Sequence, residues 1–346
     1  MVDAADARAG GDGLRPGIDV TIRGVPLAEA GDWAARAEAL GVDGVVATET
    51  NNDPFLPLAL AAGTTSRVQL GTGIAVAFPR SVMQTAYTSW DLQALTGGRF
   101  VLGLGTQVSA HVRRRYGTTW SQPAARMREY ALALRAIWDA WETGERLDFR
   151  GEFSTHTLMP PAFRPRPQPH GAPPIWLAAV RERMLEVAGE VADGVLVHPL
   201  QTEQYVRQVI RPALDRGAEK AGRPAGSCAI AVAQLVAPDE QQREAGRRRV
   251  AFYASTPGYR GVLDLHGWGA LGERLHGMSL DGAWDRMAAE VPDEMLDAIV
   301  LSGEPTAIAA AARVRTDGLV ARINVSAPER EDLDAVADVV AALVAG

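Results

Sequence analysis

The stretch GGRFVLGLGTQ, residues Gly97–Gln107, decides between two folds. An apolar run, Phe100–Leu102, leads into two glycines, Gly103 and Gly105, and polar residues follow. A dinucleotide-binding Rossmann domain also begins with a strand and a glycine-rich turn, but it needs G-x-G-x-x-G in its first strand–helix unit. Here Val108 takes the third position, and the stretch belongs to the fourth unit. The glycines instead favour close approach at the carboxyl end of a barrel strand.

Further apolar runs alternate with helical segments along the whole chain. Several of these runs are solidly apolar, as expected of parallel strands that are covered on both faces. Eight strands with intervening helices predict a (β/α)8 TIM barrel, because a doubly wound sheet commonly has fewer strands. The predicted strands are Gly17–Ile22, Gly44–Thr48, Val68–Val76, Arg99–Gly105, Pro174–Ala179, Gly194–His198, Cys228–Val236 and Val320–Val325.

Helical spacing of apolar residues predicts helices over Leu27–Leu40 and Arg126–Trp141, and Pro54 stands where a third helix would begin. Two connections are long. One follows the fourth strand and ends in the proline-rich segment Pro160–Pro174, and the other separates the seventh strand from the eighth. The second is expected to add helices over the barrel mouth. We therefore predict a disordered tail over residues 1–13 and one barrel domain over residues 14–346.

Composition limits the partners of this 346-residue chain. Its formal net charge is −7, which argues against nucleic acid as a partner. The most basic run, REAGRRRV (Arg243–Val250), reads as the solvated face of a helix. Cys228 is the single cysteine, so an intrachain disulfide is impossible, which fits a reducing compartment. No apolar run approaches the roughly 18–20 residues of a membrane span. We expect a cytoplasmic protein that binds neither nucleic acid nor membrane.

Polar residues at the ends of predicted strands indicate a pocket, because barrel active sites lie at the carboxyl ends of the strands. Asp19 lies in the first strand, Glu49 follows the second, His111 comes after the fourth and His198 ends the sixth. The histidines do not pair at metal-ligand spacing, and no G-x-S-x-G, H-E-x-x-H or Walker A motif is present. The pattern predicts a metal-free pocket that handles protons. A metal site assembled from separate strands, or purely structural carboxylates, are the alternatives.

Two segments carry a family resemblance. LGTGIAVAFPRSVMQTAYTSWDLQALTGGRFVLGLGTQ (Leu70–Gln107) and EVAGEVADGVLVHP (Glu186–Pro199) resemble signatures of the bacterial luciferase-like flavin and deazaflavin oxidoreductases. The resemblance extends roughly from Gly17 to Asp338. Residues 48–62, 103–117 and 123–130 are similar to an actinobacterial subgroup that is assigned to the deazaflavin coenzyme F420. The resemblance implies a luciferase-like barrel with insertions after strands four and seven.

The resemblance also implies where a cofactor would lie. The tricyclic ring would occupy the barrel mouth beside a non-prolyl cis peptide in strand three, and the phosphate would lie after strand five. In this chain the cis bond corresponds to Gly73-Ile74. The other implied contacts are Ala75, Val76, Thr106, Gln107 and His111 for the ring, and Ala178, Ala179, Val180 and Arg181 for the phosphate.

Two positions depart from the family pattern. Many relatives have an acid–histidine pair after strand two, where this chain has Glu49-Thr50. Many also have Gly-Pro at the phosphate turn, where this chain has Arg181-Glu182. An arginine can bind phosphate directly, whereas a glutamate repels it. The resemblance to F420-binding relatives is therefore weakest at the phosphate turn.

The function implied by the resemblance is hydride transfer between C5 of F420 and a small organic substrate. The substrate would lie beneath the segment from Tyr253 to Trp284. Glu49 and His111 are the first candidates for proton transfer, with His198 or Gln107 positioning polar groups. Two alternatives stay open: an FMN-dependent two-component monooxygenase of the same fold, and a non-catalytic barrel that binds a small molecule. The resemblance further implies a homodimer.

Overall fold

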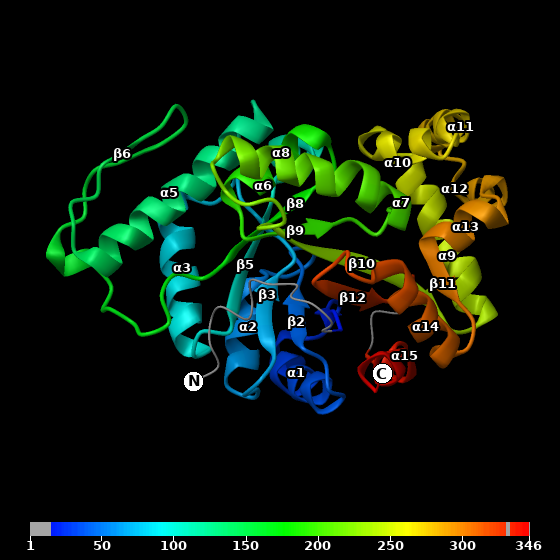
Figure 1. The fold of residues 1–346 in the computed structure, drawn as a ribbon, viewed down its shortest axis with the longest axis horizontal. Coiled ribbons are helices and arrows are strands. Elements are labelled where there is room, and N and C mark those ends of the chain that lie inside the picture. Colours follow the sequence, from blue (N-terminus) through cyan, green and yellow to red (C-terminus); the bar gives the residue numbers. More distant parts are fainter. Residues whose placement is uncertain (1–14, 330–332, 346) are drawn as a thin grey trace.

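The computed structural model describes residues 15–329 and 333–345, so the predicted disordered segment 1–13 lies outside the described residues. Within the described residues, eight parallel strands close into a barrel with helices around it (Figure 1). This confirms the predicted TIM barrel. The barrel strands, in order, are β1 (Gly17–Ile22), β2 (Gly44–Ala47), β3 (Gln69–Thr72), β5 (Phe100–Gly105), β8 (Ile175–Ala179), β9 (Gly194–Val197), β10 (Ala229–Ala237) and β12 (Arg322–Ser326).

The barrel closes between its first and last strands, where Asp19 of β1 lies opposite Asn324 of β12. Alternate residues of each strand point outward and pack under the helices. Ile18 and Val20 of β1 and Ile323 of β12 are almost completely buried in this way. The covering helices include α1 (Ala30–Ala39), α2 (Phe55–Ala62), α3 (Val82–Leu95), α6 (Glu182–Val191), α8 (Arg211–Lys220), α14 (Pro305–Thr316) and α15 (Ala337–Val344).

The third strand differs from its prediction. Instead of running over Val68–Val76, it stops at Thr72 and resumes as the two-residue strand β4 (Ala75–Val76), and both pieces pair with β5. The peptide bond between Gly73 and Ile74 is cis, at the position that the family resemblance implied. The short strand β11 (Val300–Ser302), which extends the sheet beside the end of β10, was not predicted.

The glycines of residues 97–107 have steric causes. Gly97 and Gly98 have φ angles of +67° and +90°, which favour glycine in the turn before β5. A Cβ atom at Gly103 would overlap the carbonyl oxygen of Thr72, and one at Gly105 would lie 2.7 Å from Cδ1 of Ile74. The Thr72 hydroxyl donates to the Gly103 carbonyl at 2.6 Å and accepts from its amide at 2.9 Å. Gly103 and Gly105 are therefore sites of close contact within the barrel wall.

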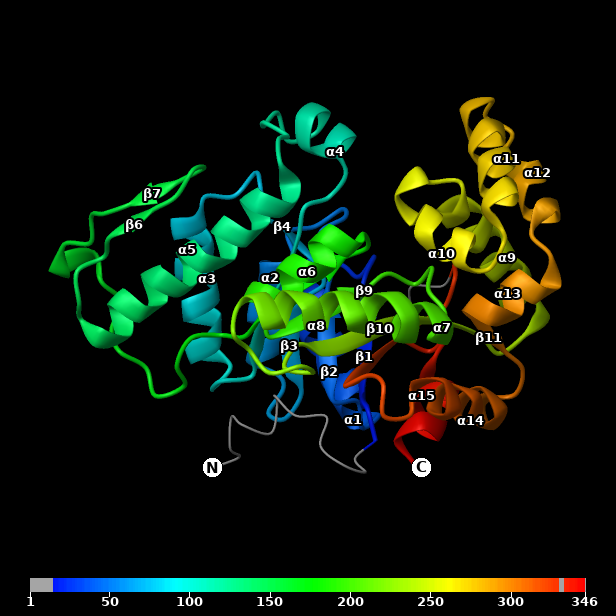
Figure 2. The same cartoon turned by 45° about the horizontal axis from the view of Figure 1, so that its top comes forward.

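Two insertions extend from the barrel. Between β5 and β8 lie α4 (Ser109–Arg114), α5 (Pro123–Thr143) and a hairpin of β6 (Phe149–Arg150) and β7 (Thr155–His156). Between β10 and β12 lie α9 (Glu240–Ala254), α10 (Arg260–Leu265), α11 (Gly269–Leu280), α12 (Trp284–Met287) and α13 (Asp293–Ile299). The hairpin and the α9–α13 group lie on opposite sides of the barrel in Figure 1. Figure 2 shows α4 and the α10–α12 group rising at the same end of the molecule.

The inserted helices α9–α13 pack in a second buried core, which includes Leu263, Leu275 and Met295 and extends to Leu235 of β10 and Val300 of β11. This packing fixes α9 beside the carboxyl end of β10 and β11. Among the described residues, no helix is both long enough and apolar enough to cross a membrane.

Candidate active site

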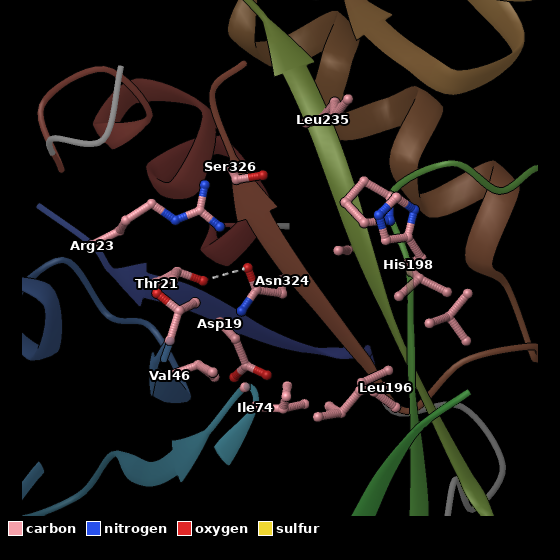
Figure 3. Close-up of a pocket in the computed structure, with 18 of the residues that line it drawn as sticks. Asp19, Thr21, Arg23, Val46, Ile74, Leu196, His198, Leu235, Asn324 and Ser326 are labelled. Atoms are coloured by element: carbon pink, nitrogen blue, oxygen red, sulfur yellow. Dashed lines mark hydrogen bonds between the residues drawn. The ribbon is translucent and has the colours of Figure 1, made fainter. Parts of the chain in front are cut away.

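A cavity of about 440 Å³ lies at the carboxyl end of the barrel. Because side chains alternate along a strand, every second residue of β1 and β12 points into the barrel. The resulting inward series are Asp19, Thr21 and Arg23 from β1 and the residue after it, and Arg322, Asn324 and Ser326 from β12. We name Thr21, Arg23, Asn324 and Ser326 the polar wall (Figure 3). The Thr21 hydroxyl donates to the Asn324 side-chain carbonyl at 2.9 Å.

An ion pair lies beneath the polar wall. Nε of Arg322 donates to Oδ2 of Asp19 at 2.8 Å, and Nη2 of Arg322 donates to Oδ1. Burial by itself disfavours the charged guanidinium, but Asp19 outweighs burial and raises the pKa of Arg322. Gly44 makes room for the pair, since a Cβ atom there would overlap the Asp19 carboxylate. Asp19 is therefore held in a bidentate structural pair.

Three rings also line the cavity. His198, which follows β9, stacks on Tyr259 with 4.1 Å between ring centroids and lies nearly perpendicular to the ring of Tyr253, with 4.4 Å between centroids. Burial lowers the pKa of His198 to about 3, so the imidazole is neutral at physiological pH. The Leu200 amide donates to Nδ1 of His198 at 3.0 Å, which places the ring proton on Nε2. His198 can therefore donate a hydrogen bond to a bound molecule.

Most of the residues predicted to contact a cofactor come together around the same cavity. Gly73 and Ile74 form part of its wall, Thr106 and Gln107 follow β5, and Ala178, Ala179 and Val180 lie at the end of β8. Gln107 has a φ angle of +58°, and its side-chain oxygen accepts from the Val108 amide at 3.1 Å. Ala75 and Val76 are fully buried in β4 and do not line the cavity.

Glu49 lies outside the cavity lining and has several partners. Its Oε2 accepts from the Val76 amide at 2.7 Å and lies 3.0 Å from Nη2 of Arg80, while Tyr116 donates to Oε1 at 2.6 Å. Burial and the hydrogen bond to Glu49 raise the pKa of Tyr116. Glu49 thus connects the end of β2 with β4 and with the chain after α4. The second predicted catalytic residue, His111, is exposed on α4 and does not line the cavity either.

The predicted phosphate turn precedes α6. Arg181 is exposed and lies outside the cavity lining, whereas Val180 lies within it. No side chain caps the helix, so its first two amides, those of Glu182 and Arg183, are left for an anion. Oε2 of Glu182 lies 3.5 Å from Nη2 of Arg216, and this cation offsets part of the repulsion expected between Glu182 and a phosphate.

The polar wall and Arg249 were not predicted from the sequence to line the cavity. The sequence pattern could have identified the polar wall, because every second residue of a strand faces the same side. Counting in steps of two from Asp19 reaches Arg23, and the same count along the last strand reaches Ser326. Arg249 lines the cavity, although the basic run that contains it was predicted to be solvated. Helical spacing alone could not show which arginine of that run faces the barrel. In the described part of the chain, no group of three or more His, Cys, Asp or Glu side chains could hold a metal ion.

Comparisons with known proteins agree with this architecture. The family model for luciferase-like monooxygenases matches residues 7–322. An uncharacterised protein of Mycobacterium tuberculosis is 47% identical over 86% of this chain and 89% of its own length. The 5,10-methylenetetrahydromethanopterin reductase of Methanolobus tindarius is 31% identical over 81% of this chain and 84% of its own. The solved coenzyme F420-dependent tetrahydromethanopterin reductase from Methanopyrus kandleri superposes with a TM-score of 0.77 at 22% identity, covering 94% of this chain and 98% of that chain. The chain belongs to the luciferase-like monooxygenase family, as its sequence motifs predicted.

Proposed function

We propose that the protein is an oxidoreductase that uses coenzyme F420 and acts on a small organic substrate. The observation that carries the proposal is the cavity at the carboxyl end of the barrel, with Gly73-Ile74 in its wall and the uncapped start of α6 nearby. The relative that is 31% identical is a reductase, and the structurally similar tetrahydromethanopterin reductase is F420-dependent. These similarities support F420 as the cofactor, and FMN stays the alternative.

The residues present fit such a cofactor. A cavity of about 440 Å³ lies within the range of roughly 300–1,000 Å³ that is common for small-molecule sites. Gly105 and Ala178 keep the wall beside Ile74 free of large side chains. Gly73 and Ile74 would hold the ring, with Thr106 and Gln107 at its edge, and the first amides of α6 would hold the phosphate. When bound, the deazaflavin supplies two-electron hydride chemistry.

The protein would orient the substrate and manage its proton. His198 carries its proton on Nε2 and stays neutral, so we assign it the role of hydrogen-bond donor to the substrate atom that gains negative charge. Glu49 and His111 stay proposed as proton-transfer residues. Because Glu49 is bonded to Arg80, Tyr116 and the Val76 amide, it also holds β4 in position.

A cofactor titration with a site-blocking variant tests the proposal. Purified protein is titrated with F420 and with FMN, followed by fluorescence, in the wild type, Ala178→Trp and Ala110→Trp. Ala178 lines the cavity, whereas Ala110 is exposed on α4 and serves as the matched control. We expect F420 to bind the wild type and the control at least tenfold more tightly than FMN does, and Ala178→Trp to weaken F420 binding at least thirtyfold.

Three outcomes would contradict the proposal in different ways. Tighter binding of FMN would support the alternative of an FMN-dependent monooxygenase. Binding of neither cofactor at saturating concentration would support a non-catalytic barrel. Unchanged F420 binding by Ala178→Trp would place the cofactor outside this cavity.

A further inference from the structure

The four arginines of the basic run on α9 have different partners. Nη1 of Arg243 lies 2.5 Å from Asp297, Nη2 of Arg247 lies 2.6 Å from Asp293, and Nη2 of Arg248 lies 2.6 Å from Glu329. Arg249 pairs with no carboxylate in the described part of the chain. Its Nε and Nη2 both donate to the carbonyl oxygen of Pro328, at 3.1 and 2.6 Å.

Arg249 is also the arginine of this run that lines the cavity. The Pro328 carbonyl accepts from the edge of the guanidinium that Nε and one N–H of Nη2 form. The opposite edge, formed by Nη1 and the second N–H of Nη2, is left for another acceptor, and we call it the open end of Arg249. Tyr253, one helical turn further along α9, places its ring 6.0 Å from Cζ of Arg249. The guanidinium is thus oriented before any ligand arrives, and ordering it on binding would cost little.

The charges around the cavity favour an anion. Asp19 is the carboxylate among the described lining residues, and it is already neutralised by its bidentate pair with Arg322. His198 adds no positive charge, since burial keeps it neutral. No carboxylate of the described lining is left to pair with Arg249, although the chain as a whole has a net charge of −7. The open end of a guanidinium matches a carboxylate in shape and charge.

We propose that Arg249 binds a carboxylate of the substrate, so that the protein acts on organic acids. The inference rests on the proposed function and adds the chemical class of its substrate. The carboxylate lies against the open end of Arg249. The carbon skeleton packs against Tyr253 and Tyr259, and the reacting group lies within reach of His198. Arg249 is therefore a specificity-determining residue.

The test compares two probes of nearly equal shape and different charge, benzoate and benzamide. Their dissociation constants are measured by calorimetry at one fixed low ionic strength, with and without saturating F420. We expect the wild type to bind benzoate at least tenfold more tightly than benzamide. Arg249→Gln should lose this preference while its benzamide affinity stays the same, and Arg249→Lys should regain part of it. Arg248→Gln, which removes the neighbouring arginine outside the cavity, should keep the full preference.

Equal affinity of the wild type for the two probes would overturn the proposal, as would a preference that persists in Arg249→Gln. A third contradicting result is an Arg249→Gln protein that binds F420 at least tenfold more weakly, because Arg249 would then hold the anionic cofactor. Failure of the wild type to bind F420 would overturn the proposed function alone. The benzoate–benzamide comparison without cofactor would still decide the role of Arg249.

Discussion

We call the Asp19–Arg322 pair the floor of the cavity, and His198 together with Arg249 its rim. Both regions are polar, but their polar groups are satisfied differently. On the floor, Asp19 and Arg322 satisfy each other through two hydrogen bonds. At the rim, Nε2 of His198 and the open end of Arg249 have no acceptor in the described part of the chain. We infer that a polar residue inside this barrel serves ligand binding where its donors or acceptors are left without a protein partner. The floor should therefore control stability, and the rim should control binding.

Breaking the floor should have the largest effect. Arg322→Leu leaves the Asp19 carboxylate buried without its partner, and we expect the free energy of unfolding to fall by about 3–5 kcal/mol. Arg248→Gln removes an exposed ion pair and should cost less than about 1 kcal/mol. Urea unfolding of both variants measures the difference. A loss below about 1 kcal/mol in Arg322→Leu would show that the pair does not stabilise the floor.

A substitution in the barrel wall should lower the free energy of unfolding almost as much. In Gly103→Ala the new methyl group overlaps the Thr72 carbonyl, and we expect a loss of about 3 kcal/mol in the free energy of unfolding. Gly277→Ala is the matched control, because Gly277 is exposed on α11 with open space around its Cα. That change should stabilise the protein by about 0.5–1 kcal/mol. Thermal unfolding at one pH compares the two, and equal effects would refute the steric explanation.

His198, at the rim, should make the stability of the protein depend on pH. The pKa of His198 is about 3 in the folded protein, and its reference value is 6.5. Between pH 3 and pH 6.5 the unfolded chain therefore binds a proton at His198 that the folded protein does not bind. Stability should therefore fall as pH drops below 6.5 and be unaffected by this group above it. Between pH 7 and pH 4.5, the free energy of unfolding of the wild type should fall by about 2–3 kcal/mol more than that of His198→Gln. Urea unfolding at both pH values checks this, and parallel losses in the two proteins would mean that His198 is not held neutral.

The sequence predicted the barrel well because apolar runs of strand length report directly on burial in a parallel sheet. The break between β3 and β4 contains the cis bond at Gly73-Ile74, which the family resemblance had implied. β11 was missed because its three residues continue directly from α13.

The candidate site was only partly predictable. Residues at strand ends, such as Thr106 and His198, could be placed in the cavity because strand ends share one edge of the barrel. The partners of Glu49 could not, because Arg80 and Tyr116 come from distant segments. Arg249 faces the cavity because α9 packs in a core shared with β10 and β11, and no local sequence pattern predicts that orientation.

A crystal structure of the protein in complex with F420 would show directly whether the barrel cavity holds the cofactor. We expect the tricyclic ring in the cavity against Gly73 and Ile74, with its phosphate at the start of α6 and Arg249 free of the cofactor. A ring bound elsewhere on the molecule, or a cavity that stays without cofactor at saturating F420, would refute the proposed F420 site.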